Sequence, residues 1–414
     1  LTLLIASSEF TFFISWNEAD VLPYSYSVFN PTWLANDWFL NLDIEYRYPF
    51  SYIIGPFIYY FGFLKTSLIG RLLTYFLFSL AYKGLIKVAN IHFIIGFTSL
   101  ALFLTYFNQN LGAGEWVIGG LETKVISYIF VLLSLKYILK SKYREALLFA
   151  GLSLSFHLLV GAYHTICLGT IIIFQLVQSK YSFSKVLKNI HFYLISGSFG
   201  IYVVIAHLHN TFSSKATAIE ENVWDVYVNF RVPHHTIPNW DKDTYIWLGI
   251  FALFNLYILW YRKKYIKDNY LSTYCLSTLL FIIIGLYIYY WGNISLLRFY
   301  FFRLGDSMIP LITLPLIFKH LFRIRLLDYS HYLRPTAYIL LVVLSGYIFY
   351  HYKAEHIKET TTGLQSFKWK KIQKKDNFDP EMTNWIKENT PKDAIFIIPF
   401  NRNDFYIDAE RPVF

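Results

Sequence analysis

The sequence predicts an all-α polytopic membrane protein of about eleven transmembrane helices, followed by the start of an external α/β domain. Three observations support this fold class. The chain of 414 residues is 55% hydrophobic, and its mean hydropathy is +0.39. Only 15% of the residues are charged, whereas soluble domains carry about a quarter. Apolar runs of roughly 17–25 residues, long enough to cross a bilayer, recur along the chain.

The expected spans follow one another with short connectors. Residues 1–14 are the end of a first span, and residues 50–64, broken by two glycines and a proline, predict an interfacial or re-entrant helix. Residues 144–178 are too long for one crossing of about 30 Å, so we expect two short spans in a hairpin. The other expected spans are 66–86, 91–107, 122–139, 190–208, 244–261, 271–291, 306–322 and 335–352.

Basic residues set the predicted orientation. With the hairpin counted as two spans, five Lys- and Arg-rich connectors fall on one side, which the positive-inside rule assigns to the cytoplasm. These connectors account for the net charge of +10, so we do not expect nucleic-acid binding. We expect an integral protein of a bacterial inner (plasma) membrane, with the long loops and the C-terminus extracytoplasmic.

Changes in composition divide the chain into three predicted regions. Residues 1–352 form a transmembrane domain that includes the external loop 16–65, and residues 353–378 form a Lys-rich linker. Residues 379–414 open a soluble α/β domain with a capped amphipathic helix, a turn and a β-rich run. Because the sequence begins with Leu and stops within this third region, we expect a fragment with a truncated C-terminal domain.

The acidic stretch 16–49 is the first candidate site. Its carboxylates Glu18, Asp20 and Asp37 lie at one membrane face among aromatic residues. Such acids can bind a divalent cation, Mg²⁺ or Mn²⁺, or act as a general base toward a hydroxyl group. The alternative is an exposed loop whose acids cap helices, with Asp37 capping a helix that starts at Trp38.

Two further loops contain polar candidates for substrate binding. Glu115 and Glu122 lie among glycines, which let the backbone approach a ligand closely. The alternative is a tight turn with Glu122 at a helix start. In a later loop, Arg231 can hold a phosphate, while His234 and His235 can donate or shuttle a proton. The alternative there is a rigid loop with stacked histidines.

Charged residues at the mouth of a later span form another candidate. Arg298 and Arg303 lie beside aromatic residues and suit a lipid-linked phosphate, although Arg303 can instead pair with Asp306. In the predicted hairpin, His157 and His164 either contact a substrate or are buried, hydrogen-bonded residues.

The topology and four sequence stretches resemble the GT-C superfamily of membrane glycosyltransferases. The stretch NEADVLPYSYSVFNPTWLANDWFLN is similar to the first external loop of that superfamily. FHLLVGAYH and FRVPHHTIPNW resemble an uncharacterised GT-C-like bacterial family, and WIKENTPKDAIFIIPF resembles the segment through which many members enter a C-terminal periplasmic domain. The resemblance covers nearly the whole chain in topology.

The resemblance implies inverting transfer of a sugar from a polyprenyl-phosphate donor to an acceptor at an external active site. It places the catalytic acid on Glu18, Asp20 or Asp37, and one of the candidate arginines would steady the departing phosphate. The DE or DxD pair of the superfamily is replaced here by Glu18-Ala19-Asp20, which leaves a metal requirement open.

Two other functions remain compatible with the sequence. A polytopic membrane transporter or lipid flippase predicts inverted repeats, broken helices and carboxylates at the bilayer midplane. A non-catalytic membrane scaffold or receptor predicts no convergence of acids and arginines. Membrane lipid is an expected partner in all three cases.

Overall fold

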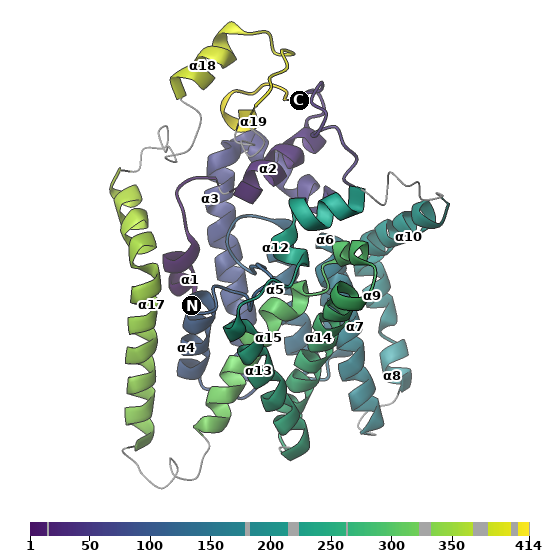
Figure 1. Ribbon diagram of the computed structural model, residues 1–414, viewed down its shortest axis with the longest axis vertical. Coiled ribbons are helices and arrows are strands. Elements are labelled where there is room, and N and C mark those ends of the chain that lie inside the picture. Colours follow the sequence, from purple (N-terminus) through teal and green to yellow (C-terminus); the bar gives the residue numbers. More distant parts are fainter. Residues whose placement is uncertain are drawn as a thin grey trace. The chain divides into compact units, whose positions relative to one another are not determined.

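The computed structural model shows an all-α membrane protein (Figure 1). Among the residues described there is no β-strand, and the single β-bridge joins Phe396 to Val413. The structure describes residues 1–14, 16–178, 183–213, 223–261, 264–322, 333–366, 380–398 and 405–413. The predicted all-α membrane class is confirmed over these residues.

The chain forms two compact units. Unit 1 contains Leu1, Phe78–Val117 and Ser127–Ala354, and unit 2 contains Thr2–Leu77, Ile118–Ile126 and Glu355–Phe414. The helices with residues in both are α3 (Tyr48–Val88), α5 (Thr123–Ile138) and α17 (Leu333–Ser366).

The helices of unit 1 pack around α14. This helix lies against α7, α13 and α15, and α6 packs against α7 and α9 (Figure 1). The other helical elements of unit 1 are α4 (Phe93–Leu104), α6 (Tyr143–Phe156), α7 (Leu158–Val177), α8 (Phe183–Leu187), α9 (Ile190–Ser196), α10 (Ser198–Ser213), η2 (Tyr227–Arg231), α12 (Pro233–Thr236), α13 (Lys242–Tyr261), α14 (Ile266–Trp291), η3 (Ile294–Phe299) and α15 (Arg303–Leu321).

Small residues allow close helix contacts in this apolar bundle. A Cβ at Gly305 of α15 would lie 2.8 Å from the Ile282 side chain of α14. A Cβ at Gly161 of α7 would lie 2.2 Å from the Leu154 backbone of α6. Lipid gives no hydrophobic drive between helices, so such close packing stabilises the bundle directly.

The predicted spans coincide with helices, but not every one of these helices is long and apolar enough to cross a membrane. Five described helices are long and apolar enough to cross a membrane, or six if the helices bent by 73° at residue 197 form one span. In the predicted hairpin the chain forms two helices, α6 and α7, which break at His157, and of these α7 is among the candidate spans. The predicted span 91–107 contains the 12-residue α4, and residues 190–208 are bent rather than straight.

A break at Gly62 divides α3. The helix has 41 residues and a length of roughly 62 Å at 1.5 Å per residue, about twice the hydrocarbon thickness. Gly62 has φ 77° and ψ 168°, so the residues before it form a helix separate from 63–88. The later part, roughly 39 Å long, suits a single crossing. The expected break in 50–64 therefore falls at its second glycine.

Unit 2 contains helices in two stretches that the sequence predicted to be a loop and a linker, 16–49 and 353–378. Its other elements are α1 (Thr2–Glu9), α2 (Trp16–Phe29), η1 (Glu45–Arg47), α18 (Pro380–Asn389) and α19 (Phe405–Asp408). The stretch expected to be a loop thus begins with a 14-residue helix. In the region assigned to a linker, residues 353–366 continue α17, and 367–378 lie outside the described residues. The amphipathic helix after residue 379 is confirmed as α18.

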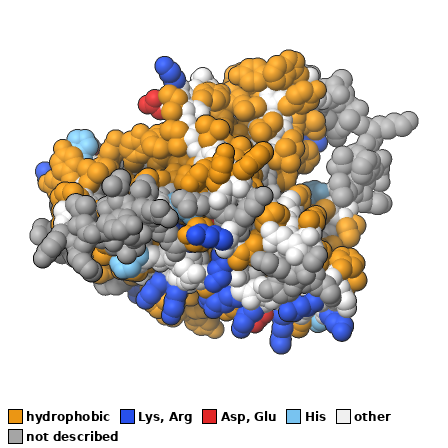
Figure 2. Space-filling view, turned by 90° about the horizontal axis from the view of Figure 1, so that it is seen from below, with side chains coloured by type: hydrophobic (Ala, Val, Ile, Leu, Met, Phe, Trp, Pro, Cys, Tyr) orange, Lys and Arg blue, Asp and Glu red, His pale blue; other side chains and the backbone are white. Residues whose placement is uncertain are grey.

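Lys and Arg side chains are visible mainly along the lower edge of the view in Figure 2, with few carboxylates beside them. This distribution agrees with the clustering of basic connectors that the sequence predicts.

Replacing Gly62 with alanine tests the break in α3. The backbone at Gly62 lies in a region of φ and ψ that is essentially open to glycine alone, and an added Cβ would meet nothing within 4 Å. We expect Gly62→Ala to destabilise the protein by about 1–3 kcal/mol through backbone strain. Unfolding by SDS titration in mixed micelles measures this loss.

Gly169→Ala in α7 is the matched control, because a Cβ there also meets nothing within 4 Å. Alanine favours a helix interior, so this variant should be neutral or more stable. Equal stability of the two variants would contradict a strained backbone at Gly62.

Candidate functional site

Arg303 is the centre of a polar cluster in unit 1. Its Nε lies 3.0 Å from Glu115 Oε2, and its Nη1 lies 3.4 Å from His157 Nε2. The guanidinium stands over the Tyr300 ring, 4.2 Å from the centroid. Glu115 is fully buried, whereas the Arg303 side chain is 12% exposed. Three separate chain segments, around residues 115, 157 and 300–303, therefore meet at one partly exposed cation.

Asp306 holds the loop that carries Glu115. Its Oδ1 accepts hydrogen bonds of 2.9, 2.8 and 3.0 Å from the backbone N–H groups of three consecutive residues, 111–113. Its Oδ2 accepts one of 3.1 Å from the Glu115 N–H. Gly114, with φ 64°, lets the loop turn so that these donors converge. The alternative Arg303–Asp306 ion pair is not observed, because Arg303 pairs with Glu115.

His235 stands against the same loop as a neutral side chain. Its Nδ1 lies 2.8 Å from the Ala113 carbonyl oxygen, and its ring lies 4.1 Å from that of exposed His234. Burial lowers the pKa of His235 to about 4, so the ring is neutral at pH 7. Nδ1–H then donates to the carbonyl group, which leaves Nε2 as an acceptor.

The Arg303 cluster has the chemistry of an anion site. Nη2 of Arg303 has no hydrogen-bond partner among the described residues and is not buried. A guanidinium that presents N–H groups beside aromatic rings can hold a phosphate with two parallel hydrogen bonds. The structure thus brings together four of the predicted residues, Glu115, His157, His235 and Arg303.

The other predicted residues of unit 1 make different contacts. The Arg298 guanidinium lies 4.1 Å from the centroid of the Trp224 ring, and Arg231 is exposed at the end of η2. His164 is buried, with its Nδ1 2.9 Å from the Tyr274 hydroxyl group. The interpretation of His164 as a buried, hydrogen-bonded residue is confirmed.

Glu18 forms a buried ion pair in unit 2. Its Oε1 accepts hydrogen bonds of 2.9 Å from Ser67 Oγ, 2.9 Å from Arg71 Nε and 2.6 Å from the Leu121 N–H. Arg71 Nη2 contacts Oε2 and also donates to the Phe13 carbonyl group. Both Glu18 oxygens are therefore engaged within the protein, which favours a structural role for this residue.

Asp37 joins the acidic stretch to the C-terminal segment. Its Oδ1 accepts 2.8 Å from the Leu40 N–H and 3.4 Å from the Tyr406 hydroxyl group, and its Oδ2 accepts 2.8 Å from the Val413 N–H. The bond to Leu40 is that of a capping aspartate, although the residues that follow, 38–41, form turns rather than a helix. Asp37 is 1% exposed.

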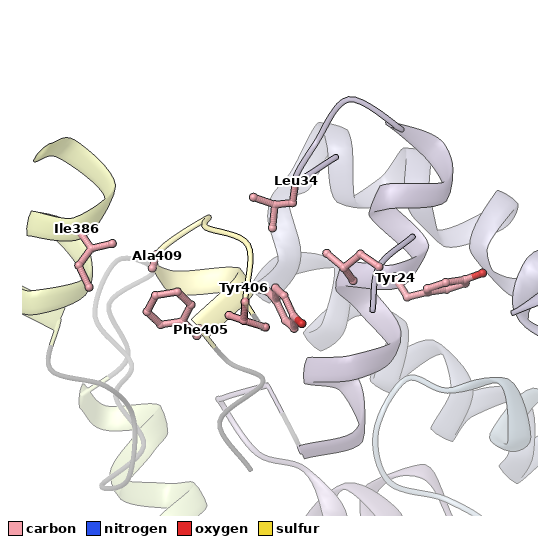
Figure 3. Close-up of a cluster of buried hydrophobic side chains, with 8 residues drawn as sticks. Tyr24, Leu34, Ile386, Phe405, Tyr406 and Ala409 are labelled. Carbon is pink, nitrogen blue, oxygen red and sulfur yellow. The ribbon is translucent and has the colours of Figure 1, made fainter. Parts of the chain in front are cut away.

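A hydrophobic cluster surrounds this connection (Figure 3). Side chains from the acidic stretch and from the C-terminal segment pack together in it, so both belong to one core. Its buried members are Tyr24, Leu34, Leu40, Ile386, Phe405, Tyr406, Ala409 and Val413.

Glu122 and Arg47 are the charged residues of unit 2 that keep an unsatisfied atom. Glu122 Oε1 and Arg47 Nη1 are buried and have no hydrogen-bond partner among the described residues. Burial raises the pKa of Glu122 to about 7, which Lys124 opposes and Glu18 reinforces. Glu122 directly precedes α5, as the sequence predicted. Asp20 is half-buried in α2.

Sequence reasoning missed the partners of the buried charges. Arg71 falls in the predicted span 66–86, and Lys319 falls at the end of the predicted span 306–322, beside a basic connector; both side chains are buried. Lys319 Nζ lies 2.5 Å from Asp268 Oδ1, and His320 Nε2 lies 3.0 Å from Asp268 Oδ2. A charge inside an apolar run was the available signal for Arg71.

No metal site is found in the part of the chain that the structure describes. No group of three His, Cys, Asp or Glu side chains there is placed to hold a metal ion.

A family model matches the C-terminal end of the chain. A family described as a domain of unknown function (DUF6798) matches residues 379–414. No curated protein matches the chain. The matched residues include α18, α19 and the segment that contacts Asp37.

Removing Arg71 tests the buried ion pair. Arg71→Met leaves the Glu18 carboxylate buried without its cation, and we expect a loss of about 3–5 kcal/mol in SDS titration. Glu18→Gln on the Arg71→Met background should recover part of that loss, because it removes the unpaired charge. Arg144→Met, at an exposed arginine over the Phe192 ring, is the control and should change stability little. A similar cost for both arginines would contradict the account.

Glu122 should make stability depend on pH. Its folded pKa of about 7 lies above the ordinary value of 4.5, so the folded state binds the proton more tightly. Wild-type stability should therefore fall as pH rises from about 4.5 to 7. In Glu122→Gln this part of the slope should disappear, as thermal unfolding between pH 4.5 and 8 would show.

Glu145→Gln, at a half-exposed acid in the first turn of α6, is the matched control for Glu122→Gln and should keep the wild-type slope. An unchanged slope in Glu122→Gln would show that Glu122 does not titrate in this range.

Proposed function

We propose that this protein is a membrane glycosyltransferase that moves a sugar from a polyprenyl-phosphate donor to an acceptor at the external membrane face. The observation that carries the proposal is the Arg303 cluster of unit 1. The partly exposed Arg303 guanidinium lies beside a buried carboxylate, one histidine and a tyrosine, and a second histidine contacts the loop that carries the carboxylate. Sequence resemblance to the GT-C superfamily supports the same reaction class.

In the proposed reaction Arg303 binds the phosphate group of the polyprenyl donor. The acceptor hydroxyl oxygen attacks the anomeric carbon of the sugar, and the bond from that carbon to the phosphate oxygen breaks. The bonding electrons stay on the departing phosphate, whose charge the guanidinium stabilises. The hydroxyl proton passes to a carboxylate base, so atoms and charge balance.

The carboxylates differ in their suitability as the base. A base must offer an oxygen to the incoming hydroxyl group, and both oxygens of Glu18 and of Asp37 already accept hydrogen bonds or ion-pair contacts. Glu122 has an oxygen without a partner among the described residues. Glu115 lies beside Arg303, but its Oε1 accepts 3.4 Å from the Tyr128 hydroxyl group and its Oε2 contacts Arg303. Asp20 is half-buried. We therefore rank Glu122 and Asp20 before Glu115, Glu18 and Asp37.

The positions of the acids favour an enzyme over a transporter. In the candidate spans that the structure describes, carboxylates occur only near helix ends, as with Asp243, Asp268 and Glu355. Ion-coupled transport usually requires ionisable groups near the bilayer midplane. The proposal includes the finer topology of about eleven spans in a bacterial inner membrane, with an external C-terminal α/β domain.

Release of free polyprenyl phosphate tests the transferase. We expect the purified protein in liposomes to release it from one member of a panel of polyprenyl-phosphate sugars. Arg303→Gln should lower the rate about 10²–10³-fold, because it removes charge stabilisation of the leaving phosphate. Arg144→Gln is the control and should keep the wild-type rate.

Carboxylate variants in the same assay identify the base. Glu122→Gln, Glu115→Gln and Asp20→Asn should include one variant whose release falls at least a hundredfold while its unfolding midpoint is retained. Release that survives all three substitutions would exclude these residues as the base. No release with any donor by folded wild-type protein would contradict the proposed function.

A further inference from the structure

Unit 2 contains a cavity of about 350 Å³ that the proposed transfer chemistry does not use. One wall is the turn after α2, and the other consists of two short pieces of the C-terminal segment. Its volume lies at the lower end of the range for small-molecule sites. The lining residues are Asn30, Thr32, Trp33, Leu34, Ala35, Asn36, Lys392, Asp393, Glu410, Arg411 and Pro412.

Each wall of the cavity contains one residue in the left-handed backbone region. Leu34 has φ 51° and Glu410 has φ 49°. Residues other than glycine rarely adopt this conformation, which costs of order 1–3 kcal/mol, and such residues cluster at ligand sites. Leu34 also packs in the hydrophobic cluster of Figure 3, which holds its wall in place.

The charges around the cavity balance. Arg411 directs its guanidinium to backbone carbonyl groups, among them those of Lys387 at 2.6 Å and Thr390 at 2.7 Å. Glu410 pairs with the Lys387 ammonium group at 2.5 Å. Lys392 and Asp393 are exposed and opposite in charge. A lining without excess charge suits a neutral ligand better than a phosphate or a carboxylate.

The uncharged side chains in the lining suit a ligand with many hydroxyl groups and an apolar face. Asn36 is exposed, and its amide group has no partner among the described residues. Asn30 and Thr32 hydrogen-bond each other at 2.8 Å and keep further donor and acceptor capacity. Trp33 supplies an indole ring fixed by packing against Tyr26, with ring centroids 4.9 Å apart.

We infer that this cavity binds a neutral saccharide of one or two sugar units. Amide and hydroxyl groups would hydrogen-bond the sugar hydroxyl groups, and the Trp33 ring would pack against its C–H face. Where the bound saccharide is the acceptor of the sugar transfer, the inference rests on the proposed transferase function. Saccharide binding itself requires no donor lipid and no transfer.

Saturation-transfer NMR with the full chain tests this inference. The probes are glucose, mannose, galactose, N-acetylglucosamine and their common disaccharides, added to protein in an amine-oxide detergent, since a maltoside detergent would compete. We expect saturation transfer to the ring protons of at least one neutral saccharide. Asn36→Ala should weaken it at least fivefold without loss of folded protein, because this side chain is exposed and has no partner among the residues that the structure describes.

Asn389→Ala is the matched control, an exposed asparagine of α18 outside the cavity lining, and it should keep wild-type binding. No transfer to any neutral saccharide, or equal transfer in Asn36→Ala and wild type, would overturn the inference. Saturation transfer to glucose 6-phosphate but to no neutral sugar would also overturn the inference. Because no donor lipid is present, these outcomes are distinct from failure of the transferase assay.

Discussion

The four hydrogen bonds that Asp306 accepts from the loop 111–115 fix the position of Glu115. A carboxylate buried in an apolar bundle must have its charge compensated, and here converging peptide N–H groups provide the compensation. Because Asp306 is satisfied by backbone, the nearby Arg303 remains available to Glu115 and to a ligand. The loop also offers the Ala113 carbonyl group that sets the tautomer of His235.

Two other buried carboxylates are compensated by side-chain cations. Glu18 is paired with Arg71, and Asp268 with Lys319 and His320. Breaking such a pair leaves an uncompensated buried charge, so each pair restricts the ways in which its elements can pack. The Arg303–Glu115 pair differs because the Arg303 side chain is 12% exposed and its Nη2 has no hydrogen-bond partner among the described residues. That difference separates a candidate binding site from a structural contact.

Sequence reasoning predicted helices well and the partners of charged residues poorly. Long apolar runs predict helices because the bilayer leaves few alternatives for the backbone, and the division of 144–178 into two helices followed from the length of that run. Glu115 and Arg303 were both singled out, but their pairing depends on a contact between segments far apart in the chain. Glu18 looked like a catalytic acid because its partner Arg71 lies in another helix, at a distance in sequence that no local pattern encodes.

The account depends most on Arg303 as the group that holds the lipid phosphate. An electron cryo-microscopy map of the full chain in nanodiscs with a polyprenyl phosphate tests this assignment directly. The account predicts phosphate density within hydrogen-bond distance of the Arg303 guanidinium, at about 2.7–2.9 Å. Phosphate density at another cation, with Arg303 still in contact only with Glu115 and His157, would contradict it.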